Sequence, residues 1–275
     1  MMKYTIRYVS LLAGMLTVFS SCEHKDLCFD HDAHAPKSDV HIKAVYEKEW
    51  EHTCEGGPDW EQYPAWESRF GMDYHELCPD APDGLRIQVY NEDGTNNVLN
   101  VAPEGDIVRM RPGEHSLLLY NNDTEYIVFD DMNSFASAKA TTRTRTRASY
   151  GGNPYMENTV ENTVNAPDML YGNYMENYTA ERKTETDELP VTMHPLVFTY
   201  LVRYEFSHGL EYVALARGAL AGMAGAVWLN SGRTSEEAVT ILYDCSVEDF
   251  GAQACVHSFG IPDYPNEHYT ARAER

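Results

Sequence analysis

The sequence is poor in positive charge and has no series of long apolar runs. It holds 21 Lys and Arg against 43 Asp and Glu, which gives a formal net charge of -22 at pH 7. Nucleic-acid binding needs a basic stripe that neutralises phosphates, so this balance argues against it. A membrane-spanning helix needs about 20 mostly apolar residues. A protein with several membrane spans is therefore excluded.

The sequence also lacks the short motifs that most often carry catalysis or hold a metal. We find no nucleophile elbow, phosphate-binding loop, dinucleotide fingerprint or zinc motif. The acidic pairs Glu104/Asp106 and Asp130/Asp131 fall at expected turns or strand ends, where carboxylates are solvated. Residues 30–34 (DHDAH) could ligate a metal, but they lie in an expected polar spacer. We expect no enzymatic activity, no cofactor and no metal site.

What the sequence does contain is typical of a folded protein. It has 275 residues, 43% of them hydrophobic and 12% aromatic, with 19 tyrosines. This aromatic content is too high for a disordered acidic chain. The length fits one large domain or two of ordinary size.

The first 21 residues have the pattern of an export signal. Lys3 and Arg7 precede a short apolar run, and the sequence Phe19-Ser20-Ser21-Cys22 follows it. Small residues before a cysteine resemble a bacterial lipobox, whose cysteine thiol takes a diacylglyceryl group. Cleavage then frees the Cys22 amine for a further acyl chain such as palmitate, and several chains give a stable anchor. The alternative is an ordinary secretory signal with a coincidental cysteine.

Five cysteines remain if Cys22 is acylated. An exported chain can oxidise them, and the pairs Cys54–Cys78 and Cys245–Cys255 would each close a short loop. Cys28 would then stay unpaired within a tether that spans residues 22–37. Reduced, buried cysteines are the alternative.

Residues 38–133 read as a β-sandwich. Period-two alternation of apolar residues predicts strands without helices between them. The sequence Asn91-Glu92-Asp93-Gly94 after one of them indicates a hairpin turn. The predicted strands cover residues 40–46, 85–89, 107–110, 115–120 and 126–129.

Residues 134–187 change in character and predict an exposed inter-domain linker. The segment contains Arg143, Arg145 and Arg147 among threonines, followed by a stretch rich in Asn, Tyr and Glu. Arginines flanked by small polar residues resemble a site for a trypsin-like protease. A solvated linker is the interpretation that we favour, because cutting there would split the protein.

Residues 188–275 predict a second β-sandwich. Alternation runs from 191 to 206 with a phase change at His194-Pro195. Residues 209–223 then show helical spacing, which predicts one short helix. Strands follow over 227–230 and 239–243. Either the second sandwich is incomplete, which leaves a strand edge for a partner, or the sequence is a shortened form.

Three features together resemble the Bacteroidales fimbrillin superfamily. They are the sequence CEHKDLC from Cys22, the strand at 40–46 followed by tryptophans, and residues 209–244. The chain is similar to fimbrium anchor and assembly subunits and to a related uncharacterised lipoprotein family. This resemblance implies two tandem transthyretin-like β-sandwiches, and a surface-exposed lipoprotein of the outer membrane. It also implies that the protein anchors or assists a fimbrium and binds pilin subunits by β-strand addition.

A surface glycan-binding lipoprotein is the alternative function. Exposed Trp50, Trp60 and Trp66 would then stack on sugar rings. Large aromatic side chains in a long loop more often close that loop over a core.

Overall fold

Strands account for most of the chain in the computed structural model, which describes residues 38–47, 66–77, 79–146, 162–183 and 185–263. The described residues all belong to one unit of the chain, residues 37–275. Several sites predicted from the sequence lie outside the described residues: the signal at 1–21, the tether at 22–37, Cys22, Cys28, Trp50, Cys54, Trp60, Cys78 and Arg147.

Two short helical segments precede the second strand, and a third follows the eleventh. They are helix α3 (Trp66–Phe70) and the 3-10 helices η1 (Tyr74–Leu77) and η4 (Leu210–Tyr212). The strands of the first half are β1 (Ser38–Tyr46), β2 (Leu85–Asn91), β3 (Asn96–Val101), β4 (Ile107–Met110), β5 (Gly113–Asn121), β6 (Ile127–Asp130) and β7 (Lys139–Thr142). Those of the second half are β8 (Thr163–Asn165), β9 (Tyr171–Ala180), β10 (Asp187–Pro195), β11 (Phe198–Glu205), β12 (Ala216–Ala224), β13 (Ala226–Trp228), β14 (Ala238–Glu248) and β15 (Gly251–Ser258).

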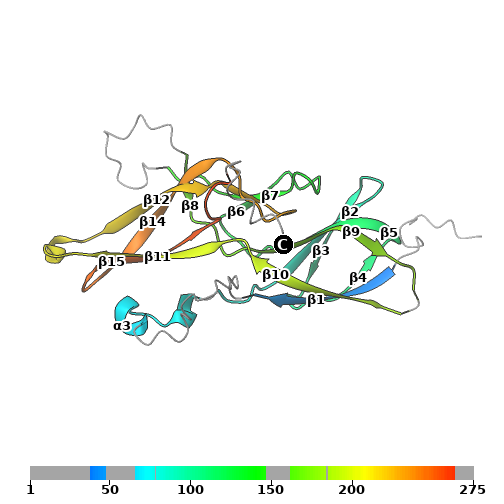
Figure 1. The fold of residues 1–275 in the computed structure, drawn as a ribbon, viewed down its shortest axis with the longest axis horizontal. Helices are drawn as coiled ribbons and strands as arrows, with labels where there is room; N and C mark the ends of the chain where they lie inside the picture. The colour runs from blue at the N-terminus through cyan, green and yellow to red at the C-terminus, as the bar shows by residue number, and fades with distance from the viewer. Residues whose placement is uncertain (1–37, 48–65, 78, 147–161, 184, 264–275) are drawn as a thin grey trace, which may run out of the picture. The chain divides into compact units, whose positions relative to one another are not determined.

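A first sandwich is built from seven strands in the order β3-β2-β5-β9-β10-β1-β4. Strands β9 and β10 pair at only two positions, where the sheet turns from one layer into the other. The layers β3-β2-β5-β9 and β10-β1-β4 enclose a core that includes Val40, Ile87, Leu119 and Met193 (Figure 1). Strand β1 pairs with β10 in parallel and with β4 antiparallel, so residues far apart in sequence form one layer.

Strand β5 is buried on both faces. Leu117 and Leu119 point into the core of the first sandwich, whereas Leu118 and Tyr120 belong to a second core on the opposite face. The three-stranded sheet β13-β7-β6 contributes to that second core with residues such as Ala140. Because side chains alternate between faces, a run of four apolar residues suits a strand covered on both sides.

A second, smaller sandwich follows. Strand β14 pairs with β12 along one side, and with β8 and then β15 along the other. Strand β15 pairs in turn with β11. The layers β8-β14-β12 and β15-β11 share a third core that includes Ile241, Tyr243 and Val256.

The predicted mainly-β, sandwich-like fold class is confirmed. Each predicted strand of residues 38–133 is present, and the Asp-Gly turn joins β2 to β3 as a hairpin. The helix predicted over 209–223 is wrong. That segment forms the three-residue η4 and then β12, because pairing with β14 outweighs a helical spacing of small apolar residues.

The segment predicted as a linker, residues 134–187, carries three strands instead. Strand β9 is central to the first sandwich, and its polar residues alternate with Tyr171, Met175 and Ala180, which are in or against the core. Strand β10 also belongs to the first sandwich, so the chain enters the second one only after Pro195. Composition suggested exposure here, but β9 contributes Tyr171 and Ala180 to the core of the first sandwich, and β10 contributes Val191 and Met193.

Gly105 allows the loop that precedes β4 to pack closely against β1. Its φ is +97°, and a Cβ atom there would lie 2.0 Å from the Ile42 carbonyl oxygen. The backbone N–H groups of Ile42 and Ala44 donate to the carbonyls of Asp106 and Glu104 at 3.1 and 2.9 Å. A side chain at 105 would therefore break pairing that β1 depends on.

We predict that Gly105→Ala lowers the free energy of unfolding by about 2–4 kcal/mol, through strain plus displacement of β1. Gly94→Ala is the matched control, because Gly94 has a φ of +79° with open space around it. It should cost only about 1 kcal/mol. Denaturant titration measures both; equal losses would contradict the role given to the close approach.

Candidate functional site

Strand β12 forms an edge of the second sandwich (Figure 1). Within the described residues it pairs with β14 alone, and its far side meets only Gly260, whose carbonyl accepts from the Ala224 N–H at 2.8 Å. From Gly218 to Gly222 no described strand pairs with that side. This row of backbone groups is a template for another strand.

The direction of the β12 backbone groups follows from those of β14. The Thr240 N–H donates to Asn162 at 2.9 Å and the Leu242 carbonyl accepts from Arg145 Nη1 at 3.1 Å, both away from β12. In an antiparallel ladder, the N–H and C=O groups of two opposite residues either face each other or both face away from the partner strand. Ala221 and Ala219 lie opposite Thr240 and Leu242. Their N–H and carbonyl groups therefore face the open side.

Strand β12 has few of the features that protect exposed edges. Its sequence ARGALAGMA contains no proline and a single charge, Arg217. Two of the other edges differ: β4 has four residues and an Arg109–Asp39 ion pair of 2.6 Å, and β11 carries Arg203 and Glu205. Natural edges are usually blunted by charge, proline or short length. Strand β3, an edge of the first sheet, also lacks charge and proline, but with six residues it is shorter than β12, which has nine. Length therefore favours β12 as the edge that accepts a strand.

The interior of the second sandwich is only partly covered next to this edge. Six buried side chains make up its core, compared with thirteen in the first sandwich, both counted over the described residues. Several apolar residues that pack against this smaller core keep part of their surface exposed: Tyr200, Val202, Leu220, Cys245 and Ala254. An added strand would remove more of this surface from water.

Tyr243 fixes the shape of the interior beneath β12. Its ring lies where a side chain at Gly218 would be, with ring atoms 2.2–2.4 Å from the position of an added Cβ. Its hydroxyl is 2.9 Å from the hydroxyl of Tyr204 on β11, which joins the two layers. Gly218 is thus required for this packing.

The arginines of the predicted protease-sensitive linker are held by strands. The backbone N–H of Arg145 donates to the Thr163 carbonyl at 2.9 Å, and the backbone carbonyl of Arg143 accepts from the Asn165 N–H at 2.9 Å. Arg145 also forms an ion pair with Asp244, with Nη2 to Oδ2 at 2.9 Å. The segment 143–145 therefore covers the edge of β8, which corrects the expectation of a solvated linker at Arg143 and Arg145.

Cys245 and Cys255 are both free thiols, so the predicted disulfide between them is absent. Ser246 on β14 pairs with Gln253 on β15. Continuing this register places Cys245 opposite Ala254, which puts the two sulfurs on opposite faces of the hairpin. Burial raises the pKa of both thiols, and the Asp244 carboxylate adds to the rise at Cys245.

The one described tryptophan of the proposed glycan platform is packed locally. The ring of Trp66 lies 4.4 Å from that of Phe70 and 5.1 Å from that of Tyr74, centroid to centroid. This arrangement supports loop closure rather than a sugar platform for Trp66. Among the described residues no group of side chains is suited to hold a metal, and no helix is long and apolar enough to cross a membrane.

A family model described as "Domain of unknown function (DUF5119)" matches residues 61–244. The chain belongs to this family. It is also 25% identical over 175 residues to a protein of Bacteroides ovatus named "Putative fimbrium anchoring subunit Fim4B". That match covers 63% of this chain and 50% of the relative, so the chain spans about half the length of the relative. The resemblance to fimbrium anchor-type proteins that the sequence predicted is confirmed.

One solved structure supports the fold of this DUF5119 member. A crystal structure titled as a "putative adhesin" from Bacteroides ovatus matches with a TM-score of 0.59 and 21% identity, over 92% of this chain and 76% of that one. The fimbrial anchor protein Mfa2 from Porphyromonas gingivalis matches with a TM-score of 0.44 and 11% identity, over 84% and 75% of the two chains. The second similarity is too low to support an argument.

Sequence reasoning did not find β12 as an edge strand. The helical spacing of its alanines and leucines was the stronger local signal. Gly218 and Gly222 were the available counter-signal, because glycine disfavours a helix interior.

We predict that Cys255→Ser changes the free energy of unfolding by less than about 0.5 kcal/mol under non-reducing conditions, because no cross-link is lost. A native disulfide would contribute about 2–4 kcal/mol. Denaturant titration with and without reductant measures this. A large loss seen only without reductant would show that the disulfide forms.

The Arg145 hydrogen bond holds the pKa of Asp244 below its ordinary value of 3.8, with Arg217 adding to the effect. A carboxyl group whose pKa is lowered in the folded state stabilises the fold at any pH above its ordinary pKa. This stabilisation is lost as the pH falls through the folded-state pKa. Since Asp244 is largely exposed, we predict that Asp244→Asn costs only about 0.5–1 kcal/mol at pH 7. The difference in free energy of unfolding between Asp244→Asn and the unmodified chain should be smaller at pH 3 than at pH 7. Asp249→Asn, at an exposed position without an ion pair, is the control, and a pH-independent loss would contradict this account.

Proposed function

We propose that this protein is an anchoring or accessory subunit of a surface fimbrium and that it acts through protein contacts, without catalysis. The relative named as a fimbrium anchoring subunit supports this proposal. The single observation that carries it is the open β12 edge beside a partly covered interior. Main-chain hydrogen bonds to β12 would hold a strand of a pilin, and the exposed interior would receive its alternate side chains.

The orientation of Ala219 permits a sharp test. Proline there would remove an N–H that faces the open side and would leave the β12–β14 ladder intact, as edge prolines do. We predict that Ala219→Pro weakens capture of purified fimbrial subunits at least tenfold. Ala219→Ser, which keeps the N–H, should bind like the unmodified chain.

Melting temperatures of both variants should be measured beside the binding, to show that the sandwich still forms. Undiminished capture by folded Ala219→Pro would rule out strand addition at β12. Failure of the unmodified chain to capture any fimbrial subunit would rule out the function itself.

We also propose that the protein is held at the outer membrane by lipid on Cys22. The sequence Phe19-Ser20-Ser21-Cys22 supports this, and so does the strong negative charge, which makes binding to anionic lipid by charge alone unfavourable. We predict that Cys22→Ala abolishes incorporation of labelled palmitate and moves the protein from the membrane fraction to the soluble fraction. Cys255→Ser is the matched control. Equal labelling of the two variants would disprove lipidation at Cys22.

A further inference from the structure

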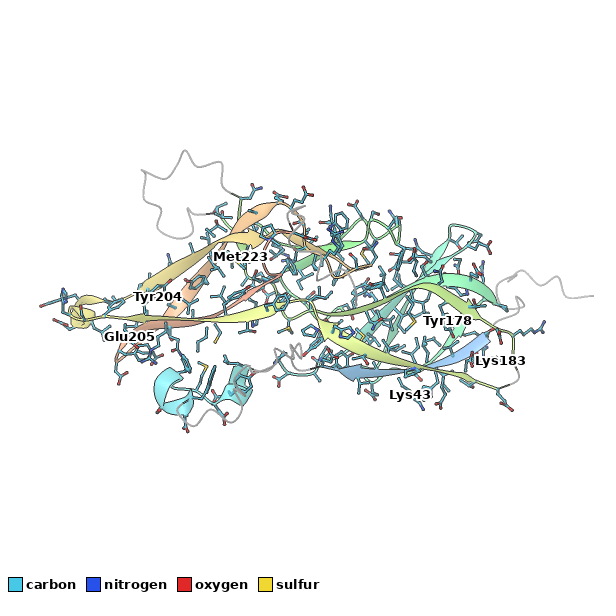
Figure 2. All side chains as sticks on the ribbon, in the orientation of Figure 1. Lys43, Tyr178, Lys183, Tyr204, Glu205 and Met223 are labelled. Atoms are coloured by element: carbon cyan, nitrogen blue, oxygen red, sulfur yellow. The ribbon has the colours of Figure 1, made fainter. Side chains whose placement is uncertain are left out.

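We propose that the far end of the second sandwich docks a protein segment that carries apolar and basic side chains together. The connection between β11 and β12 and the turn between β14 and β15 meet at this end (Figures 1 and 2). We call the surface the apolar tip, and it consists of five exposed residues: Tyr204, Phe206, Tyr212, Leu215 and Val247.

Strand pairing brings the members of the apolar tip together. Tyr204 and Val247 both lie opposite Ala252, so they flank it on one face of the sheet. The Phe206 N–H donates to the Phe250 carbonyl at 2.9 Å, which ties the end of β11 to the β14–β15 turn. Ala216, the first residue of β12, pairs with Cys245, so Leu215 just before it lies beside the same hairpin.

Two side chains of the apolar tip are mostly exposed to solvent. Tyr212 is 85% exposed and Leu215 is 62% exposed. The framework beneath them is packed, because the Arg203 guanidinium lies 3.5 Å from the centroid of the Phe250 ring. A cluster of exposed apolar side chains on a fixed framework is typical of a surface that binds a partner.

Negative charge around the apolar tip selects the kind of partner. Glu211 lies in the β11–β12 connection, and Glu248 and Asp249 lie in the β14–β15 turn. These three carboxylates form no ion pair within the described part of the chain. Anionic lipid would be repelled, and so would the acidic rim of a second copy. A segment with Lys or Arg beside apolar side chains complements both properties of the tip.

This inference is independent of strand addition at β12. The apolar tip consists of side chains at the ends of β11 and β14 and in the β11–β12 connection, whereas strand addition depends on the backbone of Ala219 and Ala221. Loss of one interaction would therefore leave the other measurable.

The test is photo-crosslinking in the bacterium that makes the protein, using the full chain. A benzophenone amino acid replaces Tyr212, and in a matched control it replaces Val45, an exposed residue of β1 in the first sandwich. We expect the Tyr212 position to crosslink at least fivefold more to a protein segment. Mass spectrometry of the crosslinked peptide should show Lys or Arg next to apolar residues.

Charge reversal then tests the acidic rim. The combined variant Glu211→Lys, Glu248→Lys and Asp249→Lys should reduce the crosslinking yield at Tyr212 at least fivefold. The combined variant Glu92→Lys, Glu114→Lys and Glu185→Lys changes the net charge equally at exposed positions elsewhere and should not.

Several results would overturn the proposal. They are crosslinks to lipid, to a second copy or to a segment without basic residues, and a yield at Tyr212 no higher than at Val45. Equal loss from the two charge-reversed variants would also overturn it, because the effect would then come from net charge. Melting temperatures of all variants exclude unfolding as the cause.

Discussion

The burial of β5 on both faces is the constraint on which the rest of the described structure depends. Leu117 and Leu119 pack in the core of the first sandwich. Leu118 and Tyr120 pack in the second core, to which the sheet β13-β7-β6 also contributes. Because one strand belongs to two cores, the first sandwich and this small sheet cannot shift independently without exposing apolar surface. Strand β10 then carries the chain from this assembly into the second sandwich.

The two sandwiches are completed to different degrees, and this difference gives the fold its function in our proposal. The first sandwich ends in β4, which is short and carries the Arg109–Asp39 ion pair, and in β3, which has six residues. The second has a long edge of small residues in β12 and a partly exposed interior. A soluble protein gains nothing from such an edge unless a partner covers it. The Tyr243 ring fills the space next to Gly218, so this part of the interior is packed without an added strand.

The acidic surface and the open apolar regions act on different properties of an interaction. Carboxylates such as Glu248 and Asp249 favour approach of a basic segment over an acidic one and so contribute to selectivity. Exposed side chains such as Tyr212 contribute contact area once the partner has arrived. In our proposal, different residues therefore select the partner and hold it.

The sequence by itself determined the mainly-β class, five of the six strands within residues 38–130 and the Asp-Gly turn, because alternation and turn chemistry are local. It did not predict β3, the second strand of that hairpin. It also identified the family resemblance. Only the tertiary structure decided that residues 216–224 form a strand, since Gly218 fits there by lying under Tyr243 of β14. It likewise decided that Cys245 and Cys255 stay apart and that Arg145 is held by Asp244. These outcomes depend on register between distant strands, which no local pattern encodes.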